Sequence, residues 1–201
     1  MHAPAHHYRI VTRWRLRGKV EETAAIVRDT IALPRWWPAA FLEARMLAPG
    51  DRRQVGMTVW LRTKGFLPYC LRFHVVLESV TPPGTCQLRV WGDFEGGCVC
   101  EARPKGDDAE LVFDWHVAVR KPLVRRLSWL LKPVFVANHL WVMRRGRESL
   151  ERELLRRRAP PGATVPPPPG PTFPHDRRTR ALVEACRQWG VTPGNRELSQ
   201  W

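Results

Sequence analysis

Residues 121–158 read KPLVRRLSWLLKPVFVANHLWVMRRGRESLERELLRRR, and this stretch decides the fold. Apolar side chains recur in it at steps of three and four residues, which is the spacing of one face of an α-helix. Pro122 suits a first helical turn, whereas Pro133 should kink or interrupt the helix, because proline has no N–H to donate. The pattern predicts one long amphipathic helix at the end of a folded domain.

The residues before this helix have the period of β-strands. Over residues 109–119, Leu111, Phe113 and Trp115 fall on one side, and Asp114 and His116 fall on the other. Such alternation is typical of a strand with one buried face and one wet face. Similar runs, separated by turn signals, precede it and predict an antiparallel meander. The predicted strands of the meander cover residues 41–47, 55–64, 69–80, 85–94, 98–104 and 109–119.

The beginning of the chain adds a further strand and two short helical segments. Residues 8–18 alternate like a strand, and residues 20–30 (VEETAAIVRDT) have a helical pattern. Residues 33–38 (LPRWWP) form a proline-bounded turn or short helix that places Trp36 beside Trp37. A sheet with one apolar face must cover that face, and the long helix is the obvious cover. We therefore expect an α+β fold in which a curved antiparallel sheet of about seven strands wraps around the C-terminal helix.

Proline marks the end of this domain. Residues 159–174 (APPGATVPPPPGPTFP) contain eight prolines and read as an extended linker, partly in the polyproline II conformation. We expect a domain over residues 1–158, this linker, and a C-terminal tail over residues 175–201 that could contain a short helix.

Composition and charge exclude several classes of protein. With 201 residues and 44% hydrophobic residues, the chain can bury a core and is not globally disordered. No secretory signal is visible, and polar residues interrupt the apolar stretch 127–143, so we expect a cytoplasmic protein without a membrane span. The five cysteines lack a CxxC pair and are expected to be reduced. The formal net charge of +14 favours anionic partners, although much of it lies in residues 120–158.

Several short motifs accompany this order of elements. They are Trp14 with 17–22 (RGKVEE), 33–38 (LPRWWP), 63–69 (TKGFLPY), 92–94 (GDF), 114–115 (DW), 121–123 (KPL), 132–135 (KPVF) and 137–139 (ANH). Over residues 8–158 the chain resembles the SRPBCC superfamily, whose START-like members have the helix-grip fold, and in particular its polyketide cyclase/dehydrase-like branch. The resemblance implies an apolar cavity between sheet and helix that binds or transforms polyketides, sterols or other lipids.

The expected pocket is lined by aromatic side chains and one amide. Asn138 falls in register with the apolar face of the long helix, where a buried amide must find a partner, and His139 lies at the edge of that face. Asn138 could orient a ligand and His139 could act as an acid or base, or both could be structural. We predict Asn138 and His139 as catalytic candidates. The predicted ligand-binding residues are Trp36, Trp37, Tyr69, Phe73, Phe113, Trp115, Asn138 and Trp141.

Three functions fit these features. The first is binding of a small hydrophobic ligand, and the second is an aromatase/cyclase enzyme that uses the same pocket. The third is a basic interaction module that uses the arginine-rich end of the helix. We do not expect nucleic acid as its partner. A weak contact with an anionic membrane surface is left open. We expect no metal and no cofactor, and the oligomeric state is left open. Strand alternation predicts that Trp60 and Trp91 point away from the core. A partner, or the C-terminal tail folding back on the sheet, would explain tryptophans in these positions.

Overall fold

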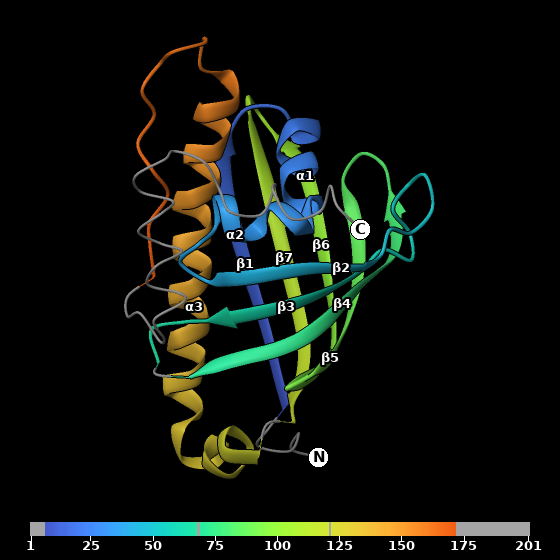
Figure 1. Ribbon diagram of the computed structural model, residues 1–201, viewed down its shortest axis with the longest axis vertical. Helices are drawn as coiled ribbons and strands as arrows, with labels where there is room; N and C mark the ends of the chain where they lie inside the picture. Colours follow the sequence, from blue (N-terminus) through green and yellow to red (C-terminus); the bar gives the residue numbers. More distant parts are fainter. Residues whose placement is uncertain (1–6, 68, 121, 172–201) are drawn as a thin grey trace, which may run out of the picture.

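The computed structural model describes residues 7–67, 69–120 and 122–171, without the side chains of 122–132. Seven antiparallel strands form one sheet in the order β1-β7-β6-β5-β4-β3-β2 (Figure 1). The elements are β1 His7–Arg17, α1 Val20–Arg28, a 3₁₀ turn Thr30–Ala32, α2 Leu33–Trp36, β2 Phe41–Ala48, β3 Thr58–Lys64, β4 Cys70–Thr81, β5 Thr85–Gly92, β6 Phe94–Lys105, β7 Asp108–Val119 and α3 Pro122–Arg158. The expected helix-grip architecture is confirmed.

One strand boundary differs from the expectation. We predicted a turn at Gly96-Gly97, but β6 runs through both glycines, and the chain reverses at Asp93 instead. The Asp93 N–H donates to the Arg72 carbonyl at 2.9 Å, which attaches this reversal to β4. Gly96 has φ +140°, and a Cβ there would lie 2.0 Å from the His116 carbonyl oxygen. The glycine therefore allows a close approach of two backbones inside the sheet and does not mark a turn.

Strand alternation places the apolar faces where the pattern predicts. In β1 the residues with even numbers from Tyr8 to Leu16 face α3, and the odd-numbered arginines are exposed. Figure 1 shows α3 running the length of the molecule beside the sheet, with α1 and α2 at the end where α3 finishes. Side chains from the inner face of the sheet, α1, α2 and α3 form one hydrophobic core. Pro133 lies inside α3 and does not end it.

Ion pairs fix the last turns of α3 to the segments beside them. The buried carboxylate of Glu153 accepts hydrogen bonds from Arg35 of α2 at 2.7 and 2.8 Å. Arg156 and Arg157 of α3 donate to the same carboxylate at 2.7 and 2.9 Å. Arg158 pairs with Glu22 of α1 at 2.6 Å and donates to the Arg17 carbonyl. Much of the arginine-rich helix end is thus used to hold the fold together.

The proline-rich segment turns back along α3. Its described part, residues 159–171, contains neither helix nor strand, and Arg152 donates to the Pro167 carbonyl at 2.9 Å (Figure 1). The short helix that we expected after residue 175 lies outside the described residues, and the division into domain, linker and tail stays a prediction. None of the described helices is both long enough and apolar enough to cross a membrane.

Candidate functional site

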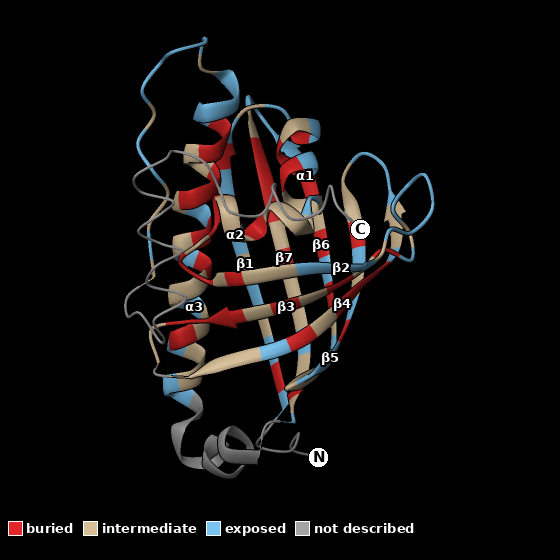
Figure 2. Cartoon of the chain, viewed as in Figure 1, coloured by how far each residue is buried: buried red, intermediate tan, exposed pale blue. Residues whose placement is uncertain are grey.

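The inner face of the sheet is tightly packed at one end and only half-buried at the other. Near α1, Leu16 and Leu111 are almost completely buried. Toward the start of β1 and the end of β7, Thr12, Trp115 and Val117 face inward but remain half-buried, although Tyr8 opposite Val117 is buried. Figure 2 shows this change along β7, from red near α1 to tan lower down. The half-buried end, together with the facing turns of α3, is the candidate site.

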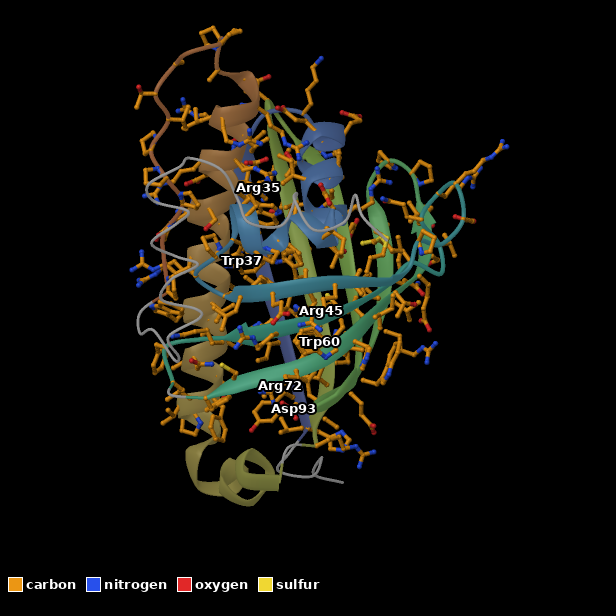
Figure 3. The ribbon with its side chains drawn as sticks, in the orientation of Figure 1. Arg35, Trp37, Arg45, Trp60, Arg72 and Asp93 are labelled. Carbon is orange, nitrogen blue, oxygen red and sulfur yellow. The ribbon has the colours of Figure 1, made fainter. Side chains whose placement is uncertain are left out.

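Tryptophans fill the packed end, and Trp14 lies at its boundary with the half-buried end, next to Thr12 on the inward row of β1. Trp37 lies 5.4 Å from Trp14 and 5.5 Å from Trp36 between ring centroids, and Trp14 lies 4.6 Å from Phe113. A Cβ at Gly146 of α3 would lie 2.2 Å from the Trp37 ring, so α3 can approach this ring only because it has glycine there (Figure 3). Trp36 and Trp37 have exposures of 2% and 6% and form part of the core between α2 and α3.

Several buried polar atoms on the inner face have no hydrogen-bond partner among the described residues. They include Thr12 Oγ1 and the indole Nε1 of Trp14 and of Trp115, and on the facing helix Nε2 of His139. The indole Nε1 atoms of Trp36 and Trp37 at the packed end have no such partner either. Thr12 and Trp14 are successive inward residues of β1, and Trp115 lies opposite Ile10 on the adjacent strand β7. Most buried polar groups in proteins are hydrogen-bonded, so a group of exceptions needs an explanation. An indole N–H can only donate, so a partner of these indoles must supply an acceptor oxygen or nitrogen.

His139 lies on α3 beside Asn138, and its side chain is half-buried whereas that of Asn138 is buried. Steps of three and four residues place His139 in one row with Phe135, Met143, Gly146 and Leu150, the last of which is fully buried. Burial disfavours the imidazolium and lowers the pKa of His139 to about 4. The side chain is therefore neutral at physiological pH. It can exchange a hydrogen bond with a ligand in this half of the interior.

The amide oxygen of Asn138 has a partner within the fold. Its Oδ1 accepts a hydrogen bond from the Leu67 N–H at 3.1 Å. A Cβ at Gly65 would lie 2.2 Å from the same Oδ1 atom, so the segment between β3 and β4 packs directly on this amide. Asn138 thereby attaches α3 to that segment.

The remaining predicted residues fall into separate groups. Tyr69 and Trp141 lie beside the segment that Asn138 holds, with ring contacts to Phe135 at 6.3 Å and to Phe66 at 6.1 Å. Burial raises the pKa of Tyr69 to about 12. Phe73 is buried on the sheet, 4.4 Å from Phe94. The structure thus brings Trp36, Trp37 and Phe113 together at the packed end through Trp14. Trp115 on β7 and His139 on α3 are both half-buried.

Thr12 and Trp14 are the polar groups of the site that the site prediction did not include. Both stand on the inward row of the first strand, so the signal was present in the alternation. A threonine hydroxyl at an inward position requires a partner, just as the amide of Asn138 does. What the pattern could not reveal is that the structure satisfies the Asn138 amide from a loop and leaves the Thr12 hydroxyl without a partner.

The two outward tryptophans are explained by neighbours on the outer face of the sheet. Trp60 is opposite Arg45 in register, and the guanidinium lies 5.2 Å from the ring centroid (Figure 3). Trp91 stacks on His74 with centroids 5.1 Å apart, and Arg89 covers it at 5.5 Å. These cation–π and stacking contacts stabilise cross-strand pairs and require no external partner.

Two hollows lie away from the candidate site. One of about 410 Å³ is open to solvent beside the start of α1, and one of about 200 Å³ lies on the outer face of the sheet near His116. Within the described residues, no three His, Cys, Asp or Glu side chains are grouped so that they could hold a metal ion.

Comparisons with solved structures identify the same architecture in other proteins. The chain superposes on the protein TTHA0849 of Thermus thermophilus with a TM-score of 0.61 at 13% identity, covering 76% of this chain and 100% of that one. The ZhuI aromatase/cyclase of Streptomyces gives 0.60 at 12% identity, over 79% and 100%. A START superfamily protein of Mycobacterium smegmatis gives 0.56 at 16% identity, over 74% and 98%. No protein-family model and no curated protein matches the sequence. The chain therefore has the fold of START-like proteins.

Proposed function

We propose that this helix-grip protein binds a small, largely apolar ligand between the half-buried end of the sheet and α3. The observation that carries the proposal is the set of buried, unpartnered polar atoms on Thr12, Trp14, Trp115 and His139. Leaving a buried donor without an acceptor costs about 1–3 kcal/mol, which a ligand oxygen would recover. The fold shared with an aromatase/cyclase and a START superfamily protein supports this choice.

The chemistry of these atoms narrows the ligand class. The surrounding walls are apolar, with Val117 and Phe94 facing the same interior. Two indole N–H groups are donors without acceptor capacity, and His139 is uncharged. The combination favours a neutral molecule with several carbonyl or ether oxygens, such as an oxygenated aromatic or a polyketide, over a plain hydrocarbon chain.

An enzyme that uses the same pocket is the second candidate. The buried, unpartnered Nε2 of His139 is the observation that favours it, because general acids and bases must reach the ligand directly. A pKa of about 4 makes this imidazole a weak base. Cyclisation would then depend mainly on holding a reactive chain in one pose. Binding is the function that the geometry supports better.

A matched pair of probes tests the binding proposal. Anthraquinone and anthracene have similar size and shape, but only anthraquinone has carbonyl oxygens. We expect native mass spectrometry to show tighter binding of anthraquinone, and a Trp115→Phe variant to weaken it about 2- to 12-fold through loss of one donor. Anthracene binding should change little in that variant.

The control is Trp91→Phe, which makes the same substitution on the outer face of the sheet. It should leave the binding of both probes unchanged. Equal binding of the two probes to the unsubstituted chain, or an equal loss in both variants, would refute the assignment. Turnover of a poly-carbonyl substrate that His139→Gln abolishes while binding persists would establish the enzyme instead.

A further inference from the structure

Three cysteines on the inner face of β5 and β6 form a thiol cluster that the ligand proposal does not use. Cys86, Cys98 and Cys100 have exposures of 5%, 3% and 3%. They lie beneath α1, whose Ala24 approaches the same part of the sheet beside Gly84. Buried cysteines usually behave as small apolar residues. Here, however, two of the three are placed so that a disulfide could join them.

Cys86 and Cys100 stand directly opposite each other across β5 and β6. Opposite residues share one face of the sheet, and both of these side chains are buried there. Directly opposite residues of antiparallel strands have Cα atoms about 4.5–5.5 Å apart, which falls inside the range of about 4.4–6.8 Å found in disulfides. Cys98 lies opposite Leu88 instead, and its diagonal distance of about 7–8 Å from Cys86 exceeds that range.

The surroundings distinguish the two thiols chemically. The hydrogen bond from Cys100 outweighs burial and, together with the nearby positive charge of Arg28, lowers the pKa of Cys86. The same hydrogen bond and burial raise the pKa of Cys100. Burial also raises the pKa of Cys98. The Nε atom of Arg28 is buried and has no hydrogen-bond partner among the described residues, so a thiolate on Cys86 would have a cation beside it.

We propose that Cys86 and Cys100 are a redox modification site that forms a reversible disulfide when the protein meets hydrogen peroxide. The Cys86 thiolate attacks one peroxide oxygen, the O–O bond breaks, and hydroxide leaves, which gives a sulfenic acid on Cys86. The Cys100 sulfur then attacks the Cys86 sulfur and displaces the hydroxyl group as water. In total, two thiols and one peroxide give one disulfide and two waters, and a dithiol reductant reverses the change.

The bond would also stabilise the sheet. It closes the short loop between Cys86 and Cys100, and this constrains the unfolded chain more than the native hairpin, in which the two residues are already neighbours. For a loop of this length the chain-entropy effect lowers the unfolding equilibrium constant on the order of a hundredfold. Oxidation should therefore raise the unfolding midpoint without altering the fold.

Peptide mapping of the full-length protein tests the site. After peroxide treatment and alkylation of free thiols, trypsin yields residues 73–89, which contain Cys86, and residues 90–105, which contain Cys98 and Cys100. We expect these two peptides to be joined, two hydrogens lighter than their sum, and to separate after reduction with dithiothreitol.

Single variants identify the partner. Cys98→Ser should keep the link, whereas Cys100→Ser and Cys86→Ser should abolish it. Peptides 73–89 and 90–105 that remain unlinked in the treated native protein would overturn the proposal without any variant. It would be overturned equally by a link that persists in Cys100→Ser, or by oxidation that links separate molecules on a non-reducing gel.

Discussion

Replacing Glu153 with glutamine tests how α3 is held against the rest of the fold. The Glu153 side chain is 3% exposed and receives hydrogen bonds from Arg35, Arg156 and Arg157. Burial opposes ionisation of this carboxyl, but the hydrogen bonds from the three arginines prevail and hold the pKa of Glu153 well below its usual range. The charged form is therefore the one that stabilises the folded state. Glu153→Gln keeps the shape and removes the charge.

The size of the effect follows from how exposed the partners are. Breaking a fully buried ion pair from one side costs about 3–5 kcal/mol. The side chains of Arg35, Arg156 and Arg157 are 28%, 53% and 34% exposed, so water can solvate them when the carboxylate is lost. We therefore expect Glu153→Gln to lower the unfolding free energy by about 2–3 kcal/mol. In a chain of this size that is a fall of roughly 4–12 °C in Tm.

Urea unfolding followed by tryptophan fluorescence measures this difference. The matched control is Glu151→Gln on the same helix, whose partner Arg147 lies 2.9 Å away and whose side chains are both more than 40% exposed. That variant should lose no more than about 0.5 kcal/mol. Because the pKa of Glu153 is lower in the folded than in the unfolded chain, its carboxylate stabilises the fold at neutral pH, and this contribution is lost as the pH falls. Glu153→Gln should therefore also make the free energy of unfolding fall less in acid. Equal losses in the two variants would refute the reasoning.

Two further changes probe the packed end and the candidate site. Gly146→Ala places a Cβ 2.2 Å from the Trp37 ring, and we expect a loss of about 1–3 kcal/mol in thermal unfolding although alanine favours helices by about 1 kcal/mol. Gly170→Ala meets no atom within 4 Å and should change nothing. Because burial lowers the pKa of His139 to about 4, below an unfolded value of about 6.5, stability should fall by roughly 3 kcal/mol as pH drops from 6.5 to 4. Urea unfolding of His139→Gln across this window should show a shallower fall, and an equally steep one would contradict the assignment.

The order and faces of the elements could be predicted because each follows from a local period. Alternation in 109–119 depends only on which side of one strand meets the core, and the structure has Leu111 and Phe113 buried as predicted. The strand boundary at Gly96-Gly97 could not be predicted in this way. A glycine pair marks equally a turn or a close approach between backbones, and only the neighbouring strand at His116 decides between them.

The site was less predictable because it depends on contacts between distant segments. Periodicity placed Asn138 on the apolar face of the helix, and it is 8% exposed. The partner of its amide is Leu67, on a segment whose position no local pattern specifies. His139, one residue further along the helix, is half-buried. Which ligand or side chain its imidazole meets depends on the facing segments, and no local pattern specifies them.

The two ends of the interior support each other energetically. The contact of Gly146 with Trp37 and the arginines around Glu153 fix α3 at one end. The other end leaves Thr12, Trp115 and His139 with unsatisfied polar atoms, each of which costs about 1–3 kcal/mol. A fold of marginal stability tolerates that cost only if the anchored end is strong enough to keep α3 in place. A ligand bound as we propose would recover this cost, so we expect its affinity to depend on how firmly the opposite end holds α3. We therefore expect Glu153→Gln to reduce ligand affinity, because α3 is held less firmly, although the residues that contact the ligand are unchanged.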